Sequence, residues 1–263
     1  MKHSFLDRYA YQDTALHRLD GRVKVVVLAA LILASATTPL GAGWTLAAYA
    51  LLEVLIFALA RVPLSYVALR CLAALPFVLA AAASAPFLKG GETLWSGSLL
   101  GLRLEVTQVG LATAANVIGR ACVSLAALVA LLSITPMAGL LESLRRLKAP
   151  PVLVMLAGFA YRYIFLLVDE AERVRMARDS RWFGRRGTLW QARVLGRMVG
   201  SLLVRSFERA ERVYGAMLAR GYEGTGARLP AARLGGADIG FLAAGLGLIA
   251  LLRGSSLWLP RLL

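Results

Sequence analysis

The chain has 263 residues, of which 59% are hydrophobic and only 17% are charged, and its mean hydropathy is +0.67. This composition excludes an ordinary water-soluble globular domain and predicts an integral membrane protein. The formal net charge of +15 would suit nucleic-acid binding, but it is also typical of a membrane protein whose basic residues lie on one side of the bilayer.

Five apolar runs predict membrane-spanning helices, because about 20 apolar residues are needed to cross about 30 Å of hydrocarbon. Four of the runs lie in the first half of the chain, at 23–38, 45–60, 69–88 and 109–134, and the fifth lies at 238–258. A further apolar run, 152–168, carries Arg162 in its middle. Its placement depends on the charges around it.

The charges between the runs predict the orientation of the helices. Basic residues precede the first run and follow the second, and the loop between these runs has no charge (Arg18, Arg22, Arg61, Arg70). Lysine and arginine concentrate in cytoplasmic loops. The N-terminus is therefore predicted to lie in the cytoplasm, in a multi-pass protein of the cell inner (cytoplasmic) membrane.

The stretch 135–236 holds 18 of the 30 lysines and arginines and 8 of the 15 acidic residues. Four preceding spans would place this stretch in the cytoplasm. If 152–168 also crossed, the arginines from Arg173 to Arg233 would lie outside, against the charge rule. We therefore interpret 152–168 as a helix in the membrane interface or against the bundle.

The predicted fold is an all-α integral membrane protein with about five transmembrane helices and a cytoplasmic domain of long amphipathic coupling helices. Its predicted parts are an N-terminal transmembrane region at 1–134, the cytoplasmic domain at 135–236 and a C-terminal transmembrane helix at 237–263.

Two charged residues of opposite sign lie deep inside predicted spans. Arg120 lies near the middle of the fourth span and Glu53 near the middle of the second, and an unpaired arginine in lipid is costly. We predict an intramembrane pair of Glu53 and Arg120, joined by Asn116 one turn away. A clasp that fixes helix packing is favoured over a transport pathway.

A regular stripe of apolar residues predicts a long amphipathic helix that ends at Gly221. The stripe follows the spacing i, i+3, i+4 and i+7, with arginines between its members (Leu195, Met198, Val199, Leu202, Val213, Met217). Glycine tolerates the left-handed conformation that follows a helix, so Arg220 should lie in the last turn.

The segments 172–179 and 211–221 share Glu-Arg-Val followed by Ala-Arg, so two helices each place an arginine near their C-terminal end. Each arginine could simply complement the negative end of its helix dipole, which is worth about 0.3–1 kcal/mol. A shared docking role is the alternative, and the pattern leaves both open.

Several enzyme motifs are missing from the sequence. None of the four lysines is followed by Ser or Thr as in a P-loop, and there is no H-E-x-x-H or G-x-S-x-G. His3 and His17 are too few and too isolated for a transition-metal site. We expect no catalytic residues, no cofactor and no metal site, and hence no enzyme.

Four stretches together resemble the transmembrane T component of energy-coupling factor (ECF) transporters, of the cobalt-uptake CbiQ type. They are D-R-Y-A-Y-Q-D-T-A-L-H-R-L-D-G-R-V-K at 7–24, T-P-M-A-G-L-L-E-S-L-R-R-L-K-A-P at 135–150, Y-R-Y at 161–163 and R-S-F-E-R-A-E-R-V-Y-G-A-M-L-A-R-G-Y-E-G at 205–224. The likeness covers nearly the whole chain in the same order.

The resemblance implies a mechanical role. The chain would transmit ATP-driven motion from two ATP-binding subunits of the CbiO type to a CbiM-type substrate-binding membrane subunit, which a small CbiN-type subunit can accompany. The lipid bilayer is the other implied partner, and nucleic acid is not one. The ATPase-coupling residues carried over are those of the two Ala-Arg motifs (Ala177, Arg178, Asp179, Ala219, Arg220, Gly221).

One position departs from the family pattern. Asp179 stands where members often have Gly or Ser, and its carboxylate could screen Arg178 or pair with it. Three other functions stay open: the T component of a nickel importer, a membrane-anchored basic module that binds anionic lipid or nucleic acid, and a channel or carrier that acts alone.

Overall fold

The computed structural model describes residues 9–85, 93–99, 102–181, 187–224 and 234–258. These residues are mostly helical, which confirms the all-α membrane fold expected from composition. The chain divides into two compact units. The bundle unit comprises 2–143 and 232–263, and the two-helix unit comprises 144–231.

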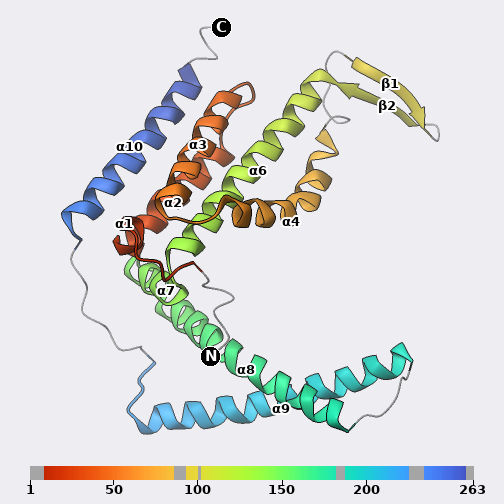
Figure 1. Cartoon of the computed structure of the whole chain (residues 1–263), viewed down its shortest axis with the longest axis vertical. Coiled ribbons are helices and arrows are strands. Elements are labelled where there is room, and N and C mark those ends of the chain that lie inside the picture. Colours follow the sequence, from red (N-terminus) through yellow and green to blue (C-terminus); the bar gives the residue numbers. More distant parts are fainter. Residues whose placement is uncertain (1–8, 86–92, 100–101, 182–186, 225–233, 259–263) are drawn as a thin grey trace. The chain divides into compact units, whose positions relative to one another are not determined.

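The bundle unit is organised around one long central helix, α6 (Gln108–Ile134). The helices α2, α3 and α4 each pack against α6, and α10 packs against α2 and α3. Figure 1 shows α2, α3, α6 and α10 side by side. The other helices of this unit are α1 (Ala15–Arg18), α2 (Gly21–Ala36), α3 (Gly43–Leu59), α4 (Leu64–Ala82) and α10 (Gly236–Trp258), together with most of α7 (Met137–Arg146).

Local chemistry explains where these helices begin. The Asp20 carboxylate accepts a hydrogen bond from the Arg22 N–H at 2.8 Å and caps α2, and the Thr107 hydroxyl caps α6 by accepting from the Gly110 N–H at 3.2 Å. α4 begins five residues before the predicted run, directly after Pro63. The last residues of that predicted run, 86–88, lie outside the described part of the chain.

The packing of the bundle relies on small residues at close contacts. Ala127 and Ala130 of α6 are fully buried, as are Leu31 and Tyr49. At Gly245 of α10, an added Cβ would lie 2.8 Å from a methyl carbon of Val27. Small residues at these positions therefore let the helix backbones approach closely.

A β-hairpin precedes α6 and was not predicted. Its strands are β1 (Thr93–Leu99) and β2 (Leu102–Thr107), paired antiparallel with a register shift between Thr93 and Trp95. The alternation of apolar and polar residues in the L-R-L-E-V-T of β2 was a usable signal. It was hidden by the stronger apolar run that follows.

Length and composition make α4, α6, α8 and α10 able to cross a membrane, and α3 is a shorter apolar helix. The chain is therefore a multi-pass membrane protein. α8 qualifies through its apolar first half, which is the run 152–168. The prediction that this run does not cross rests on the arginines that follow it.

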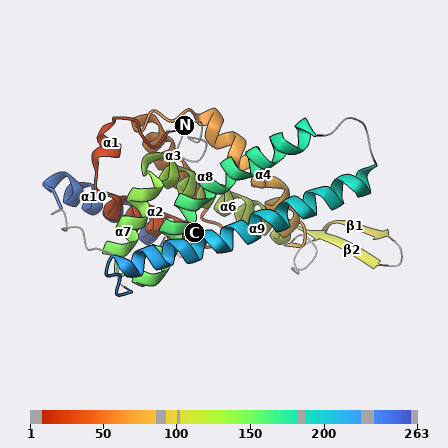
Figure 2. The same ribbon diagram turned by 90° about the horizontal axis from the view of Figure 1, so that it is seen from below.

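The two-helix unit consists of α8 (Pro151–Ser180) and α9 (Thr188–Ala219). Pro151 occupies the first turn of α8, where its missing N–H costs no hydrogen bond. Figures 1 and 2 show that α9 returns across α8 in roughly the opposite direction. The predicted amphipathic helix is thus confirmed, and it runs to 32 residues.

Candidate functional site

A Schellman motif closes the C-terminal end of α9. The Tyr222 N–H donates to the Met217 carbonyl at 3.1 Å, and the Gly221 N–H donates to the Leu218 carbonyl at 3.0 Å. Gly221 has a φ of +79°, a conformation that strains any residue with a Cβ. The helix therefore ends where the sequence predicted, and backbone groups alone close it.

The side chain of Arg220 is left exposed at this end. It makes no hydrogen bond or ion pair with any residue that the structure describes. Ala219 is the last helical residue before it. Because the backbone completes the cap, the guanidinium group of Arg220 has its donors available for a partner.

Arg178 stands in the last turn of α8 and is already paired. Its Nε and Nη2 donate to Oδ1 of Asp179 at 2.8 and 2.6 Å. The second oxygen of that carboxylate lies 3.8 Å from Nε of Arg175. Asp179 was expected either to screen Arg178 or to pair with it, and the structure contains the pairing.

Arg178 also lines a hollow of about 510 Å³ at the end of α8. The lining residues come from both helices (Glu170, Arg173, Val174, Ala177, Arg178, Arg181, Met198, Arg205). Four of them are arginines and one is acidic, so the hollow keeps a surplus of positive charge even after Asp179 is counted. A negatively charged group would fit this charge.

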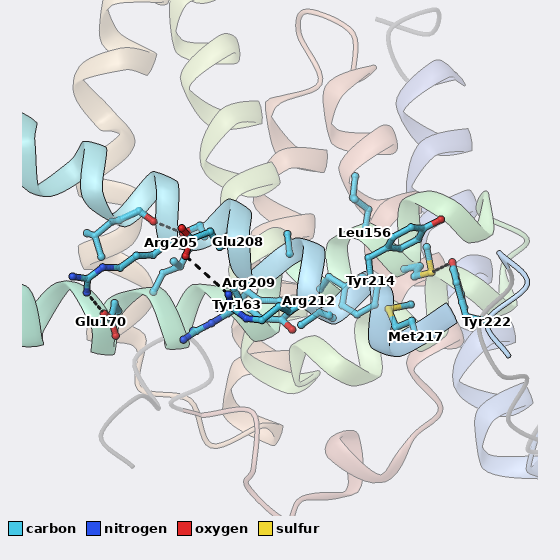
Figure 3. A pocket seen from close by; sticks show the side chains of 17 residues that line it. Leu156, Tyr163, Glu170, Arg205, Glu208, Arg209, Arg212, Tyr214, Met217 and Tyr222 are labelled. Atoms are coloured by element: carbon cyan, nitrogen blue, oxygen red, sulfur yellow. Dashed lines mark hydrogen bonds and ion pairs between the residues drawn. The ribbon is translucent and has the colours of Figure 1, made fainter. Parts of the chain in front are cut away.

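A second, more apolar groove of about 570 Å³ runs between α8 and α9 (Figure 3). Phe159 and Tyr163 of α8 and Val213 and Met217 of α9 are among the residues that line it. At one end, the Tyr222 hydroxyl lies 2.9 Å from the Met155 sulfur atom. The groove therefore joins the start of α8 to the end of α9.

An ion pair across the two helices separates the groove from the hollow. Nη1 of Arg205 donates to Oε1 of Glu170 at 2.7 Å, and Arg173 donates to the other oxygen at 2.9 Å. The hydrogen bond from Arg205 is the main reason why the pKa of Glu170 lies below its usual value. Glu170 is thus ionised near neutral pH and keeps its two arginines in place.

The two motif arginines lie at separate points of the two-helix unit. Arg178 shares the hollow with Arg205, and Arg220 stands fifteen residues beyond Arg205 on α9. At a rise of about 1.5 Å per residue, this is about 22 Å along the helix. A partner that holds both arginines therefore needs two contact points.

The two helices also expose many large apolar side chains (Leu153, Leu156, Ile164, Met176, Leu195, Val199, Leu203, Phe207, Tyr214, Leu218). No residue of α8 or α9 is buried. Exposed apolar surface on this scale marks a surface that contacts lipid or another protein.

Inside the bundle, Arg120 has a different partner from the predicted one. Its Nη2 donates to the carbonyl oxygen of Thr38, which follows α2. No ion pair joins Arg120 to Glu53, both of which the structure describes. Asn116 is buried one turn away, and its Oδ1 has no hydrogen-bond partner among the described residues.

The register of α3 against α6 explains the difference. Gly119, next to Arg120, packs against Leu46 of α3, whereas the carboxyl group of Glu53 lies beside the backbone of Ala127. Ala127 is seven residues beyond Arg120, or about 10 Å along α6. The two charged groups therefore lie at different depths in the bundle.

Among the described residues, no three His, Cys, Asp or Glu side chains gather in a way that could hold a metal ion. Cys71 in α4 and Cys122 in α6 are half-buried free thiols.

The sequence did not predict the contacts between residues that are far apart in the chain. The partners in the ion pair of Glu170 and Arg205 are 35 residues apart. Lys24 and His17 contact carbonyl groups at the end of α6 that are more than 100 residues away. No local pattern marks either set of partners.

Comparison with known proteins identifies the family. Residues 12–230 match the CbiQ family of cobalt transport proteins. The chain is 27% identical over 224 residues to an uncharacterised protein of Methanocaldococcus jannaschii, a match that covers 85% of this chain and 82% of that protein. It is 29% identical over 245 residues to the energy-coupling factor transporter transmembrane protein EcfT of Listeria innocua, covering 85% and 86% of the two chains.

A third relative is the putative fused cobalt transport protein CbiMQ of Methanocorpusculum labreanum, 31% identical over 137 residues, which are 51% of this chain and 22% of that one. The family match spans most of the chain, including both Ala-Arg motifs. The chain therefore belongs to the CbiQ family, the transmembrane energy-coupling components of ECF transporters.

Proposed function

We propose that this chain is the energy-coupling subunit of a cobalt importer, which links two ATP-binding subunits of the CbiO type to a CbiM-type substrate-binding membrane subunit. One observation carries the proposal: two arginines stand at separate points of the helix pair, each at the C-terminal end of a long helix. A guanidinium group can donate two parallel hydrogen bonds to a carboxylate, so each arginine can hold one acidic acceptor.

Two separate contacts would convert motion between the ATP-binding subunits into motion of the helices. If Arg178 is held by one subunit and Arg220 by the other, closure of the pair shifts the end of α8 relative to the end of α9. The exposed apolar surface of α8 and α9 would pass this shift to the substrate-binding subunit. The chain itself performs no catalysis in this scheme.

The orientation proposed for the chain follows from its charges. The two-helix unit carries most of the arginines, and we place it on the cytoplasmic side of the inner membrane, together with the N-terminus. ATP is available on that side. A small CbiN-type subunit can complete the complex.

Two alternatives compete with cobalt import. A nickel importer would use the same T component, since a partner subunit selects the metal. The other alternative, a basic module for anionic lipid or nucleic acid, is supported by the arginine-lined hollow.

Salt dependence separates docking by the two motifs from diffuse charge attraction. Neutralising six to ten phosphates loses about 10³–10⁵ in affinity between 50 and 200 mM salt. We expect retention of the ATP-binding subunits by the tagged chain to fall by less than about tenfold over this range. A steep fall, together with equally strong retention of anionic vesicles or DNA, would support the basic module instead.

Asp179 gives a prediction about the strength of the first contact. Because its carboxylate occupies Nε and Nη2 of Arg178, Asp179→Asn should free the guanidinium group and strengthen binding of the ATP-binding subunits about 2- to 5-fold. Titration of purified ATP-binding subunits against the chain in nanodiscs measures this. Glu172→Gln removes the same charge from the same helix and should leave the affinity unchanged.

A further inference from the structure

The N-terminal segment of the bundle unit plays no part in the proposed docking, yet it holds a buried lysine. Lys24, in the first turn of α2, is only 2% exposed. Its Nζ donates to the carbonyl oxygens of His17 at 2.9 Å and of Ile134 at 3.2 Å. A buried ammonium group is costly unless it is hydrogen-bonded, so a lysine is a poor choice for packing alone.

His17 makes a second contact of the same kind. Its Nε2 lies 3.3 Å from the Ser133 carbonyl oxygen and 3.1 Å from that of Tyr9, and its Nδ1 lies 2.7 Å from the Thr14 hydroxyl. Ser133 and Ile134 are the last two residues of α6. The carbonyl groups of a last helical turn have no partner within the helix. Lys24 and His17 therefore satisfy the end of α6 from another segment.

The same segment also holds the start of α10. The Asp20 N–H donates to Oδ1 of Asp238 at 2.8 Å, and the Gly235 N–H donates to Oδ2 of the same carboxylate at 2.8 Å. The N-terminal segment thus joins the end of α6 to the starts of α2 and α10.

The end of α6 leads directly into α7. Thr135 is buried, and the Leu140 N–H donates to the Pro136 carbonyl at 2.9 Å in the first turn of α7. The boundary between the two units falls between Ser143 and Leu144, inside this one helix. Any freedom at the junction of α6 and α7 would therefore change the direction in which the chain enters the two-helix unit.

We propose that Lys24 and His17 are positioning residues that clamp the junction of α6 and α7, so that α7 is a rigid base for the two-helix unit. The inference rests on the proposed function, because α8 and α9 can transmit motion to a partner only if the helix that carries them, α7, does not move freely. Without the clamp, movement of α8 and α9 would be absorbed at the junction. The ATP-binding subunits would still bind and hydrolyse ATP, but less substrate would move per ATP.

The clamp itself is tested without any partner. Hydrogen–deuterium exchange of the full chain in nanodiscs should show amides 140–143 exchanging about tenfold faster in Lys24→Met, because two carbonyl groups lose their donor. His17→Leu should act in the same direction, and His17→Gln, which keeps an N–H donor, should act less. Lys148→Met replaces an exposed lysine and is the matched control. Wild-type exchange in both Lys24→Met and His17→Leu would overturn the clamp.

The consequence for function is tested in the assembled transporter. In proteoliposomes with all subunits, Lys24→Met and His17→Leu should keep co-purification and ATP hydrolysis within about twofold of wild type, while Co²⁺ uptake per ATP falls about tenfold. If uptake and hydrolysis fall in proportion, the positioning role is wrong. If the wild-type chain binds no ATP-binding subunits at all, the proposed function is wrong. The exchange experiment still tests whether Lys24 and His17 hold the junction of α6 and α7.

Discussion

Replacing Arg220 with alanine is expected to abolish co-purification of the ATP-binding subunits, while the chain itself still folds and inserts. Arg220 is exposed at the end of α9 and has no partner among the described residues, so its guanidinium group is available to an acceptor on another protein. Removing one member of a buried charge pair at an interface costs about 2–5 kcal/mol. A loss of that size takes a moderately tight complex below detection in a pull-down.

Two features of the structure make this test specific to the side chain of Arg220. The end of α9 is closed by backbone groups of Gly221 and Tyr222, so Arg220→Ala leaves the cap intact. Arg193→Ala removes the same charge from the first turns of the same helix and should barely change co-purification. Quantified pull-downs, with the thermal unfolding midpoint as a check on folding, give the result. Equal losses from the two variants would mean that total charge, and not the motif, binds the partner.

The two arginines are not equivalent: the sequence marks Asp179 as a residue that could screen or pair with Arg178, and the structure contains the pairing. Arg220 is free of partners among the described residues, whereas Arg178 must exchange the Asp179 carboxylate for an acceptor on the partner. We therefore expect the contact at Arg220 to dominate the affinity. The contact at Arg178 is the one that Asp179→Asn should strengthen.

The features that could be predicted from the sequence are those encoded over a few neighbouring residues. Apolar runs of sufficient length predicted α2, α3, α6 and α10, and the stripe that ends at Gly221 predicted α9. In each case the determining information lies within the element itself. The start of α4 was misplaced by five residues, because Pro63 and not hydropathy determines where that helix begins.

The features that escaped prediction depend on contacts between distant segments. The ion pair of Glu170 and Arg205 joins two helices, and Lys24 reaches a carbonyl group 110 residues away. Neither partner is marked by a local pattern. The predicted pair of Glu53 and Arg120 failed to form for the same reason, since similar depth in two spans does not determine how one helix slides against the other.

Arg120→Ala is expected to destabilise the bundle strongly, by about 2–4 kcal/mol, because it removes a charged donor to the Thr38 carbonyl and the packing of a half-buried side chain. The loss should appear as a lower thermal unfolding midpoint in detergent micelles and as unfolding at a lower fraction of SDS. Thr38 is itself buried, so no solvent water replaces the missing donor easily.

Glu53→Gln decides whether Arg120 acts alone or as half of a clasp. Because the structure separates the two groups by about 10 Å along α6, the two changes should be additive to within about 0.5 kcal/mol, and Glu53→Gln should not rescue Arg120→Ala. The double-mutant cycle therefore compares two packings of α3 against α6. A rescue of more than about 1 kcal/mol would show that the charges meet in the membrane, which requires a shift of about two turns in the register of α3 against α6.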